Sequence, residues 1–299
     1  MILDTEEAYF TKCTLCSSGQ IRNLKNYKKD YLVKCKSCNF IFSSKIPTSL
    51  ELNQVYENYS RGNEITSLTR LKNQNLAKII LSYHPSITTC LDIACGEGSL
   101  LEAFKELSIE TSGTEHESGK NLLVQKGIDF IEGEFFPKTE KRFDLIIFTE
   151  AIEHINDQNI FLKHAIDLLN PGGLIYMTTP NVNSLEKRIL RSRWGMFVYP
   201  EHLSYYSPRT INLLHTKLGL EKVINRTENI SVYRLVEYFN SFYKKKDSDN
   251  YDPISSSNRI QDITSSNLFL NIIKRVINFL LNLFGLGTSL ITLYRKPLT

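Results

Sequence analysis

The feature that most constrains the fold is one short stretch, residues 91–98, which reads LDIACGEG. The apolar and β-branched residues before it, 87–91, predict a short buried strand, and leucine and phenylalanine recur at helical spacing over 100–107. A strand, a glycine-containing turn and a helix in this order point backbone N–H groups at whatever lies above the strand end. Because Gly96 and Gly98 lack a Cβ atom, a ligand can approach the backbone closely there.

An acidic residue stands at the end of this strand and at the end of the next. Asp92 ends the first strand, and the segment 109–115 ends in Glu115. A carboxylate beside the turn disfavours a phosphate group and favours a cationic ligand. In dinucleotide-binding folds an acid in the second position hydrogen-bonds ribose hydroxyls. On this stretch alone, a tight turn in an unrelated α/β protein stays open as the alternative.

The pattern Asp92-x-Ala94-x-Gly96-x-Gly98, followed by Glu115, resembles that of class I S-adenosylmethionine (SAM)-dependent methyltransferases. The family usually has glycine where Ala94 stands. The resemblance implies SAM as cofactor, with these five residues around it. Asp92 is expected to orient the charged methionine end, and Glu115 is expected to hold the ribose.

The resemblance covers residues 86–226 and returns at the C-terminus. A short strand at 129–131 leads to Glu134 and Phe135. In the family an acid at this place lies beside the adenine, and an apolar neighbour packs on the ring. The resemblance therefore assigns Glu134 and Phe135 to the cofactor site.

Strands alternate with helices along this part of the chain, which predicts a parallel, doubly wound sheet with ligands at the carboxyl ends of its strands. The run 143–148 is typical of a central strand buried on both faces. Residues 170–173 (NPGG) are expected to end a helix before the strand 174–181. The resemblance implies a Rossmann-like α/β sheet of seven strands, with 220–227 as the sixth and 289–294 as the antiparallel last.

The chain divides into five expected parts. The 299 residues suffice for one sizeable core with appendages. The expected parts are a zinc ribbon at 1–45, a helical cap or linker at 46–85, the SAM-binding core at 86–228, an insertion at 229–287, and the last core strand with the tail at 288–299.

Two Cys-x-x-Cys pairs lie near the N-terminus, Cys13 with Cys16 and Cys35 with Cys38. Two such pairs at this spacing predict a four-cysteine zinc site. The segment is too small to bury a core of its own, so we expect a structural metal to hold it together. A redox pair and unrelated surface thiols are the alternatives. Several lysines make the segment basic, so a nucleic-acid or protein partner stays open.

The insertion ends in a long apolar run, 268–284, in which asparagine and basic residues recur at intervals of three and four. This pattern predicts an amphipathic helix. Its length and its two central cations argue against a membrane-spanning segment. It suits either an interfacial helix on a membrane or a helix packed on the protein or on a dimer partner. Residues 244–259, rich in serine, aspartate, asparagine and lysine, predict a mobile loop.

The acceptor of the methyl group is expected near the ends of the fourth and fifth strands. Glu150, Glu153 and His154 follow the fourth strand, and His202 comes from the loop after the fifth. Together they suit a divalent ion, Mg²⁺ or Mn²⁺, with positions open for substrate oxygens. The pattern is similar to that of plant small-RNA 3′-terminal ribose methyltransferases and of metal-dependent quinone-precursor O-methyltransferases. The metal-free alternative gives His154, His202 or Glu150 a catalytic role in orienting or deprotonating the acceptor.

The loop 194–207 resembles that of a methyltransferase subgroup found with polysaccharide and glycolipid biosynthesis. The leading hypothesis is therefore a SAM-dependent methyltransferase acting on a sugar hydroxyl of a small-molecule or lipid-linked acceptor. A quinone precursor and an RNA-terminal ribose are the alternative acceptors. A zinc-ribbon binding module with an inactive methyltransferase-like domain is the alternative of another class.

The N-terminus is acidic and contains no apolar run, so no secretory signal is expected. This favours a cytoplasmic protein with reduced cysteines. If the segment 268–284 is an interfacial helix, it is the peripheral contact at the inner face of the membrane. The net charge of +4 is too small to imply nucleic acid by itself.

Overall fold

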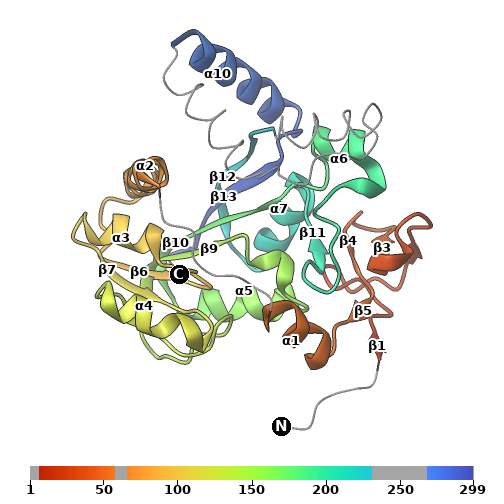
Figure 1. Ribbon diagram of the computed structural model, residues 1–299, viewed down its shortest axis with the longest axis horizontal. Helices are drawn as coiled ribbons and strands as arrows, with labels where there is room; N and C mark the ends of the chain where they lie inside the picture. The colour runs from red at the N-terminus through yellow and green to blue at the C-terminus, as the bar shows by residue number, and fades with distance from the viewer. Residues whose placement is uncertain (1–6, 58–65, 231–267, 299) are drawn as a thin grey trace, which may run out of the picture.

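A computed structural model describes residues 7–57, 66–230 and 268–298 (Figure 1). Its centre is a seven-stranded sheet in the order β12-β13-β10-β9-β6-β7-β8. Strands β6 to β10 pair in parallel, and β13 lies antiparallel between β10 and β12, which confirms the expected fold class. The bounds are β6 Thr89–Asp92, β7 Glu110–Gly113, β8 Asp129–Phe130, β9 Phe143–Thr149, β10 Leu169–Pro180, β12 Glu221–Glu228 and β13 Ser289–Arg295.

Helices cover both faces of this sheet. In β9, Ile146 and Phe148 join one core with α5 and α7, and Leu145 and Ile147 join a second core with α2, α3 and α4. Alternate residues of a strand point to opposite faces, so a strand between two helical layers is apolar throughout. The bounds are α1 Ser49–Glu57, α2 Ser67–Tyr83, α3 Ser99–Lys105, α4 Lys120–Gln125, α5 Gln158–Asp167, α6 Leu185–Leu190 and α7 Pro208–Lys217. Short 3-10 turns are η1 Lys28–Asp30, η2 Glu117–Gly119, η3 Ile152–His154 and η4 Arg191–Arg193.

The N-terminal segment forms small sheets of its own on the side of the molecule away from α3 and α4 (Figure 1). One sheet has the order β11-β4-β3-β2, and the other pairs β1 with β5. The bounds are β1 Ala8–Tyr9, β2 Ile21–Asn23, β3 Leu32–Cys35, β4 Ile41–Ser43, β5 Lys45–Ile46 and β11 Ser204–Tyr205. Strand β11 comes from the loop after β10, so this sheet joins segments far apart in the sequence.

The turn of residues 170–173 differs from its prediction. The helix α5 ends earlier, at Asp167, and residues 170–173 lie within β10. The pairing of β10 with β9 shifts register between Leu169 and Leu174, so the proline and glycines form a bulge near the start of the strand. Bulges are the places where a strand tolerates both residue types.

The helix α10, Leu268–Leu283, packs on β12 with Leu281 buried and with two asparagines bonded to the sheet edge. Asn282 Oδ1 accepts a hydrogen bond from the backbone N–H of Thr227 at 3.0 Å, and Asn278 Oδ1 accepts one from Asn229 at 3.1 Å. The apolar side faces outward, with Phe279 66% and Leu283 64% exposed. The expected mobile loop, 244–259, lies outside the described residues. Within the described ranges, no helix has the length and apolar character needed to cross a membrane.

Candidate functional site

The turn after β6 adopts an unusual backbone. Ala94, Gly96 and Gly98 have φ values of 56°, 58° and 70°, in the left-handed region. A Cβ atom at Gly98 would lie 2.7 Å from the Leu123 side chain and 2.8 Å from that of Ile128, so this position requires glycine. Ala94, where the resemblance leads one to expect glycine, takes the same conformation at a steric cost.

Asp92, at the end of β6, is a buried carboxylate with an unused oxygen. It is 2% exposed, and its Oδ1 atom has no hydrogen-bond partner among the described residues. Burial, together with the neighbouring Glu115 carboxylate, raises the pKa of Asp92 well above its usual range. A buried acid left in this state is suited to a cationic ligand, whose charge would stabilise the ionised form.

Glu115 is bonded to the same turn directly, and the backbone of Glu134 is connected to it through Thr114. Glu115 Oε2 accepts a hydrogen bond from the backbone N–H of Gly96 at 2.8 Å. The Thr114 hydroxyl accepts one from Ala94 N–H at 3.1 Å and donates one to the Glu134 carbonyl at 2.6 Å. Phe135 is half-buried against the core. The structure therefore brings the predicted cofactor residues to one edge of the sheet.

On the acceptor side, the chain turns sharply after β9. Glu150 has a φ of 50°, and η3 follows it. Glu153 is 1% exposed; its Oε2 accepts a hydrogen bond from the Thr179 hydroxyl at 2.9 Å, and its Oε1 has no partner among the described residues. Burial, and then the nearby Glu150 carboxylate, raises the pKa of Glu153 well above its usual range.

Two histidines complete this side. Nδ1 of His154 lies 2.9 Å from the Glu201 carbonyl, and Nδ1 of His202 lies 3.0 Å from the Met196 carbonyl. Burial lowers the pKa of His154, which favours its neutral form. Ligand atoms of Glu153, His154 and His202 all lie within 4.8 Å of one another. We call these three residues the acceptor triad. Glu150, the fourth expected ligand, falls outside this cluster.

The four N-terminal cysteines also converge. Their sulfur atoms all lie within 4.8 Å of one another, with Cys13 3.6 Å from Cys38 and Cys16 3.6 Å from Cys35. A hydrogen bond from Cys38 lowers the pKa of Cys13 to about 5. A zinc ion about 2.3 Å from four sulfurs sets neighbouring sulfurs about 3.8 Å apart, so the arrangement fits a tetrahedral zinc site. We call these four residues the cysteine cluster.

Two threonines of the site were not among the residues predicted from the sequence. Thr114 links the turn after β6 to Glu134, and Thr179 holds Glu153. Both lie at or just after the carboxyl ends of strands, and that position was the available signal.

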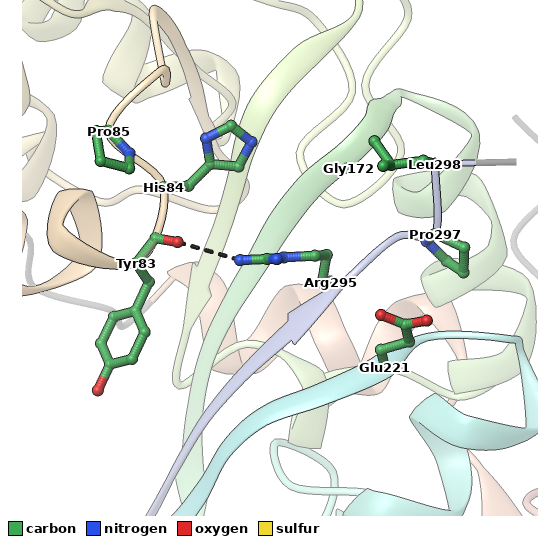
Figure 2. Close-up of a pocket in the computed structure, with 8 residues that line it drawn as sticks. All are labelled: Tyr83, His84, Pro85, Gly172, Glu221, Arg295, Pro297 and Leu298. Carbon is green, nitrogen blue, oxygen red and sulfur yellow. Dashed lines mark hydrogen bonds between the residues drawn. The ribbon is translucent and has the colours of Figure 1, made fainter.

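A cavity of about 510 Å³ lies at the other end of the sheet, where β10 and β12 begin. Figure 2 shows the Arg295 guanidinium pointing at the Tyr83 carbonyl, to which it donates a hydrogen bond of 3.1 Å. His84 and Glu221 lie on either side of it. The cavity contains none of the predicted site residues.

Comparison with known proteins identifies the family. The family model described as "Methyltransferase domain" matches residues 64–224, more than half of the chain. The chain belongs to this family, and it is a methyltransferase of the SAM-dependent class.

Curated relatives carry the name ubiquinone biosynthesis O-methyltransferase. The protein of that name from Pelagibacter ubique is 28% identical over 193 residues, which cover 62% of this chain and 74% of the relative. The one from a Bradyrhizobium strain is 32% identical over 141 residues, 39% of this chain and 54% of the relative. The chain thus spans about half the length of several of the relatives that it matches.

Solved structures of similar fold include a SAM-dependent methyltransferase from Archaeoglobus fulgidus, with a TM-score of 0.49, 18% identity, and coverage of 76% of this chain and 94% of that one. Another is the N-methyltransferase NodS from Bradyrhizobium japonicum, in complex with S-adenosyl-L-homocysteine. Its TM-score is 0.48, with 14% identity and coverage of 83% and 99% of the two chains.

Proposed function

We propose that this protein is a SAM-dependent O-methyltransferase whose acceptor presents two adjacent oxygen atoms. The observation that carries the proposal is the acceptor triad, a carboxylate and two imidazoles gathered at the end of β9. Strand β9 pairs with β6, which ends in Asp92, so the two halves of the site end on neighbouring strands. Such adjacency suits transfer between two bound molecules, because alignment is the main requirement of the reaction.

On the cofactor side, the unused oxygen of Asp92 is suited to the ammonium group of the methionine moiety. Glu115 would hold the ribose hydroxyls. Glu134 and Phe135 would flank the adenine. SAM supplies a methyl group on a sulfonium, already activated for transfer.

On the acceptor side, the triad would hold Mg²⁺ or Mn²⁺, which when bound lowers the pKa of a hydroxyl next to it. Glu153 fits such an ion because one of its buried oxygens lacks a hydrogen-bond partner. The carbonyl contacts at Nδ1 of His154 and His202 fix both rings. In the reaction the acceptor oxygen bonds to the methyl carbon as the carbon–sulfur bond breaks. The hydroxyl proton leaves to solvent; in the metal-free alternative, neutral His154 is the base suited to take it.

The relatives favour a quinone precursor as the acceptor, since they are named for ubiquinone biosynthesis. A sugar with adjacent hydroxyls is the second candidate and rests on the resemblance of the loop 194–207. Both acceptors have the same requirement, two neighbouring oxygens beside one divalent ion.

The test is incubation of the purified protein with labelled SAM and a panel of catechol-type quinone precursors, nucleotide sugars, lipid-linked sugars and RNA. Labelling of the catechols supports the first candidate, and labelling of sugars alone supports the second. Transfer to RNA alone would contradict both acceptors. Absence of SAM binding by calorimetry would favour an inactive binding module.

Structural zinc at the cysteine cluster is part of the proposal, supported by the sulfur spacing. One zinc per chain should remain after dialysis.

A lipid surface is the proposed partner of α10. Its outward side carries Val276, Phe279, Leu280 and Leu283, which are 47–66% exposed, beside the exposed cation Arg275. Apolar residues bordered by a cation suit the boundary between acyl chains and anionic headgroups. Its C-terminal end is bound to Thr227, near the carboxyl end of β12, the edge of the sheet at which the acceptor triad also lies.

A further inference from the structure

The residue after His202 is held by its backbone from two sides. The Leu203 carbonyl accepts a hydrogen bond from Ser43 N–H at 2.8 Å, and Leu203 N–H donates one to the Glu153 carbonyl at 2.7 Å. Ser43 belongs to β4 of the N-terminal segment, and Glu153 belongs to the acceptor triad. One backbone residue therefore joins the N-terminal sheet to the candidate metal site.

This connection extends into a strand pair. Immediately after Leu203, β11 pairs with β4, with Ser204 opposite Phe42 and Tyr205 opposite Ile41. The loop that carries His202 thus continues directly into β11, the edge strand of the N-terminal sheet. Glu201, whose carbonyl contacts His154, lies on the same short segment.

The cysteine cluster controls the hairpin that β11 pairs with. Cys35 ends β3, Cys38 lies in the turn before β4, and Cys35 N–H donates to the Phe40 carbonyl at 2.9 Å. Strands β3 and β4 have only four and three residues. Hairpins this short are marginal without an added constraint, which a metal on four sulfurs would supply.

Side chains reinforce the link. Leu32 and Ile41 of the hairpin share one core with Trp194, Phe197 and Tyr205 of the loop. Trp194 is 1% exposed, in a core to which the hairpin contributes Leu32 and Ile41 and the main domain contributes Val182 and Leu190. Loss of the hairpin would therefore expose part of this aromatic cluster to water.

The segment between Cys13 and Cys16 is hydrogen-bonded to two helices of the main domain. Lys217 Nζ, at the end of α7, donates to the Leu15 carbonyl at 3.0 Å, and Gln158 Nε2, at the start of α5, donates to the Thr14 hydroxyl at 3.0 Å. Leu15 is fully buried. The cluster therefore bridges the helices of the main domain and the loop of His202.

The cofactor side has hydrogen bonds of its own, although Leu91, Ile93 and Phe135 share a core with the cysteines. Hydrogen bonds from Gly96 to Glu115, from Ala94 to Thr114 and from Thr114 to Asp92 connect β6 and β7. Within the parts of the chain that the structure describes, none of these bonds involves the N-terminal sheet.

We infer that the cysteine cluster positions His202, so that its metal is coupled to divalent-ion binding at the acceptor triad and not to SAM binding. The coupling is reciprocal, since each metal favours the arrangement of Leu203 that the other requires. The inference rests on the proposed acceptor-side metal, and it assigns the N-terminal segment a positioning role.

The test compares full-length wild type with Cys16→Ser plus Cys35→Ser. Four quantities are measured: zinc content, SAM affinity by calorimetry, Mn²⁺ affinity by electron paramagnetic resonance, and hydrogen-exchange protection of the Leu203 amide. We expect the variant to lose zinc, keep SAM affinity within about twofold, bind Mn²⁺ about tenfold or more weakly, and lose protection at Leu203. Ser37→Ala, at the exposed tip beside Cys38, should change none of these.

A second variant keeps the cysteines. Ser43→Pro removes the N–H that donates to Leu203, so it should retain zinc and SAM binding while weakening Mn²⁺ binding. Zinc loss with unchanged Mn²⁺ affinity and unchanged Leu203 protection would overturn the inference. If the wild type binds no Mn²⁺ but zinc loss still exposes Leu203, the acceptor-side metal of the proposed function fails while the positioning of His202 stands.

Discussion

The imidazole rings of His154 and His202 meet edge to face, with centroids 4.8 Å apart and planes at 89°. The first residue ends the turn after β9, and the second comes from the loop after β10. Each ring is held by a backbone carbonyl at Nδ1. Because the two rings lie beside Glu153, we propose that they bind a divalent ion and that the acceptor presents two adjacent oxygens to it.

The acceptor triad predicts a dependence on divalent ions. Activity should fall in EDTA and return with Mg²⁺ or Mn²⁺ but not with Zn²⁺ alone. His202→Ala and Glu153→Gln should each lose Mn²⁺ binding in a resonance titration while SAM affinity is kept. Thr179→Val, which removes only the hydrogen bond to Glu153, should weaken Mn²⁺ binding by about tenfold. Full activity in chelator, with zinc still bound at the cysteine cluster, would rule this metal out.

Asp92→Asn should weaken SAM binding but raise the stability of the ligand-free protein. SAM affinity should fall about 100-fold, the usual scale for loss of one partner of a buried charge pair. The free variant should nevertheless melt above wild type at pH 8. The raised pKa of Asp92 means that the folded state binds this proton more tightly than the unfolded state, so wild-type stability declines as pH rises above 3.8 toward the folded pKa. Melting temperatures at pH 5.5 and 8, without ligand, check this.

Asp144→Asn is the matched control with the opposite sign. Burial opposes ionisation of Asp144, but hydrogen bonds from Thr88, Asn170 and Thr89 outweigh it and lower its pKa from 3.8 to about 2. Its stabilisation is present above pH 3.8 and is lost as pH falls toward 2. The variant should therefore be less stable than wild type at neutral pH, by a gap that narrows below pH 3.8, with SAM affinity unchanged. Equal pH profiles for the two variants would contradict both assignments.

Ala94→Gly should stabilise the protein slightly. Left-handed backbone costs alanine about 1–2 kcal/mol, and the greater freedom of glycine in the unfolded chain offsets about 0.4–1 kcal/mol of that gain. A net increase of about 0.5 kcal/mol in the free energy of unfolding is expected by urea titration. Ala103→Gly, inside α3, should instead destabilise by about 1 kcal/mol.

The outward side of α10 predicts vesicle binding. Wild type should co-sediment with anionic vesicles, and Phe279→Ser plus Leu283→Ser should reduce this by removing apolar contact area. Arg275→Glu should reduce binding to anionic vesicles more than to neutral ones. Asn282→Ala should cost about 1 kcal/mol of stability, because Thr227 N–H loses its acceptor, yet keep vesicle binding. A wild type that stays in the supernatant would point to a dimer partner for this surface.

Local sequence determined the cofactor side and the cysteine cluster. Asp92 ends β6 and Glu115 follows β7, two parallel strands separated by one helix, so both residues emerge at the same edge of the sheet. The Cys-x-x-Cys pairs likewise specify a cluster of four thiols at short range. Hydrophobic periodicity and spacing suffice for these features, because each depends on neighbours close in the chain.

Tertiary structure decided the acceptor side and the orientation of α10. Nothing in the local pattern pairs Phe42 with Ser204, and that pairing places His202. The asparagine stripe of α10 predicted an amphipathic helix but not which of its sides packs on the sheet. Backbone N–H groups of Thr227 and Asn229 at the sheet edge need acceptors, and Asn282 and Asn278 supply them. Backbone hydrogen bonds between distant segments carry no signature in side-chain periodicity, so only the folded chain shows which residues they bring together.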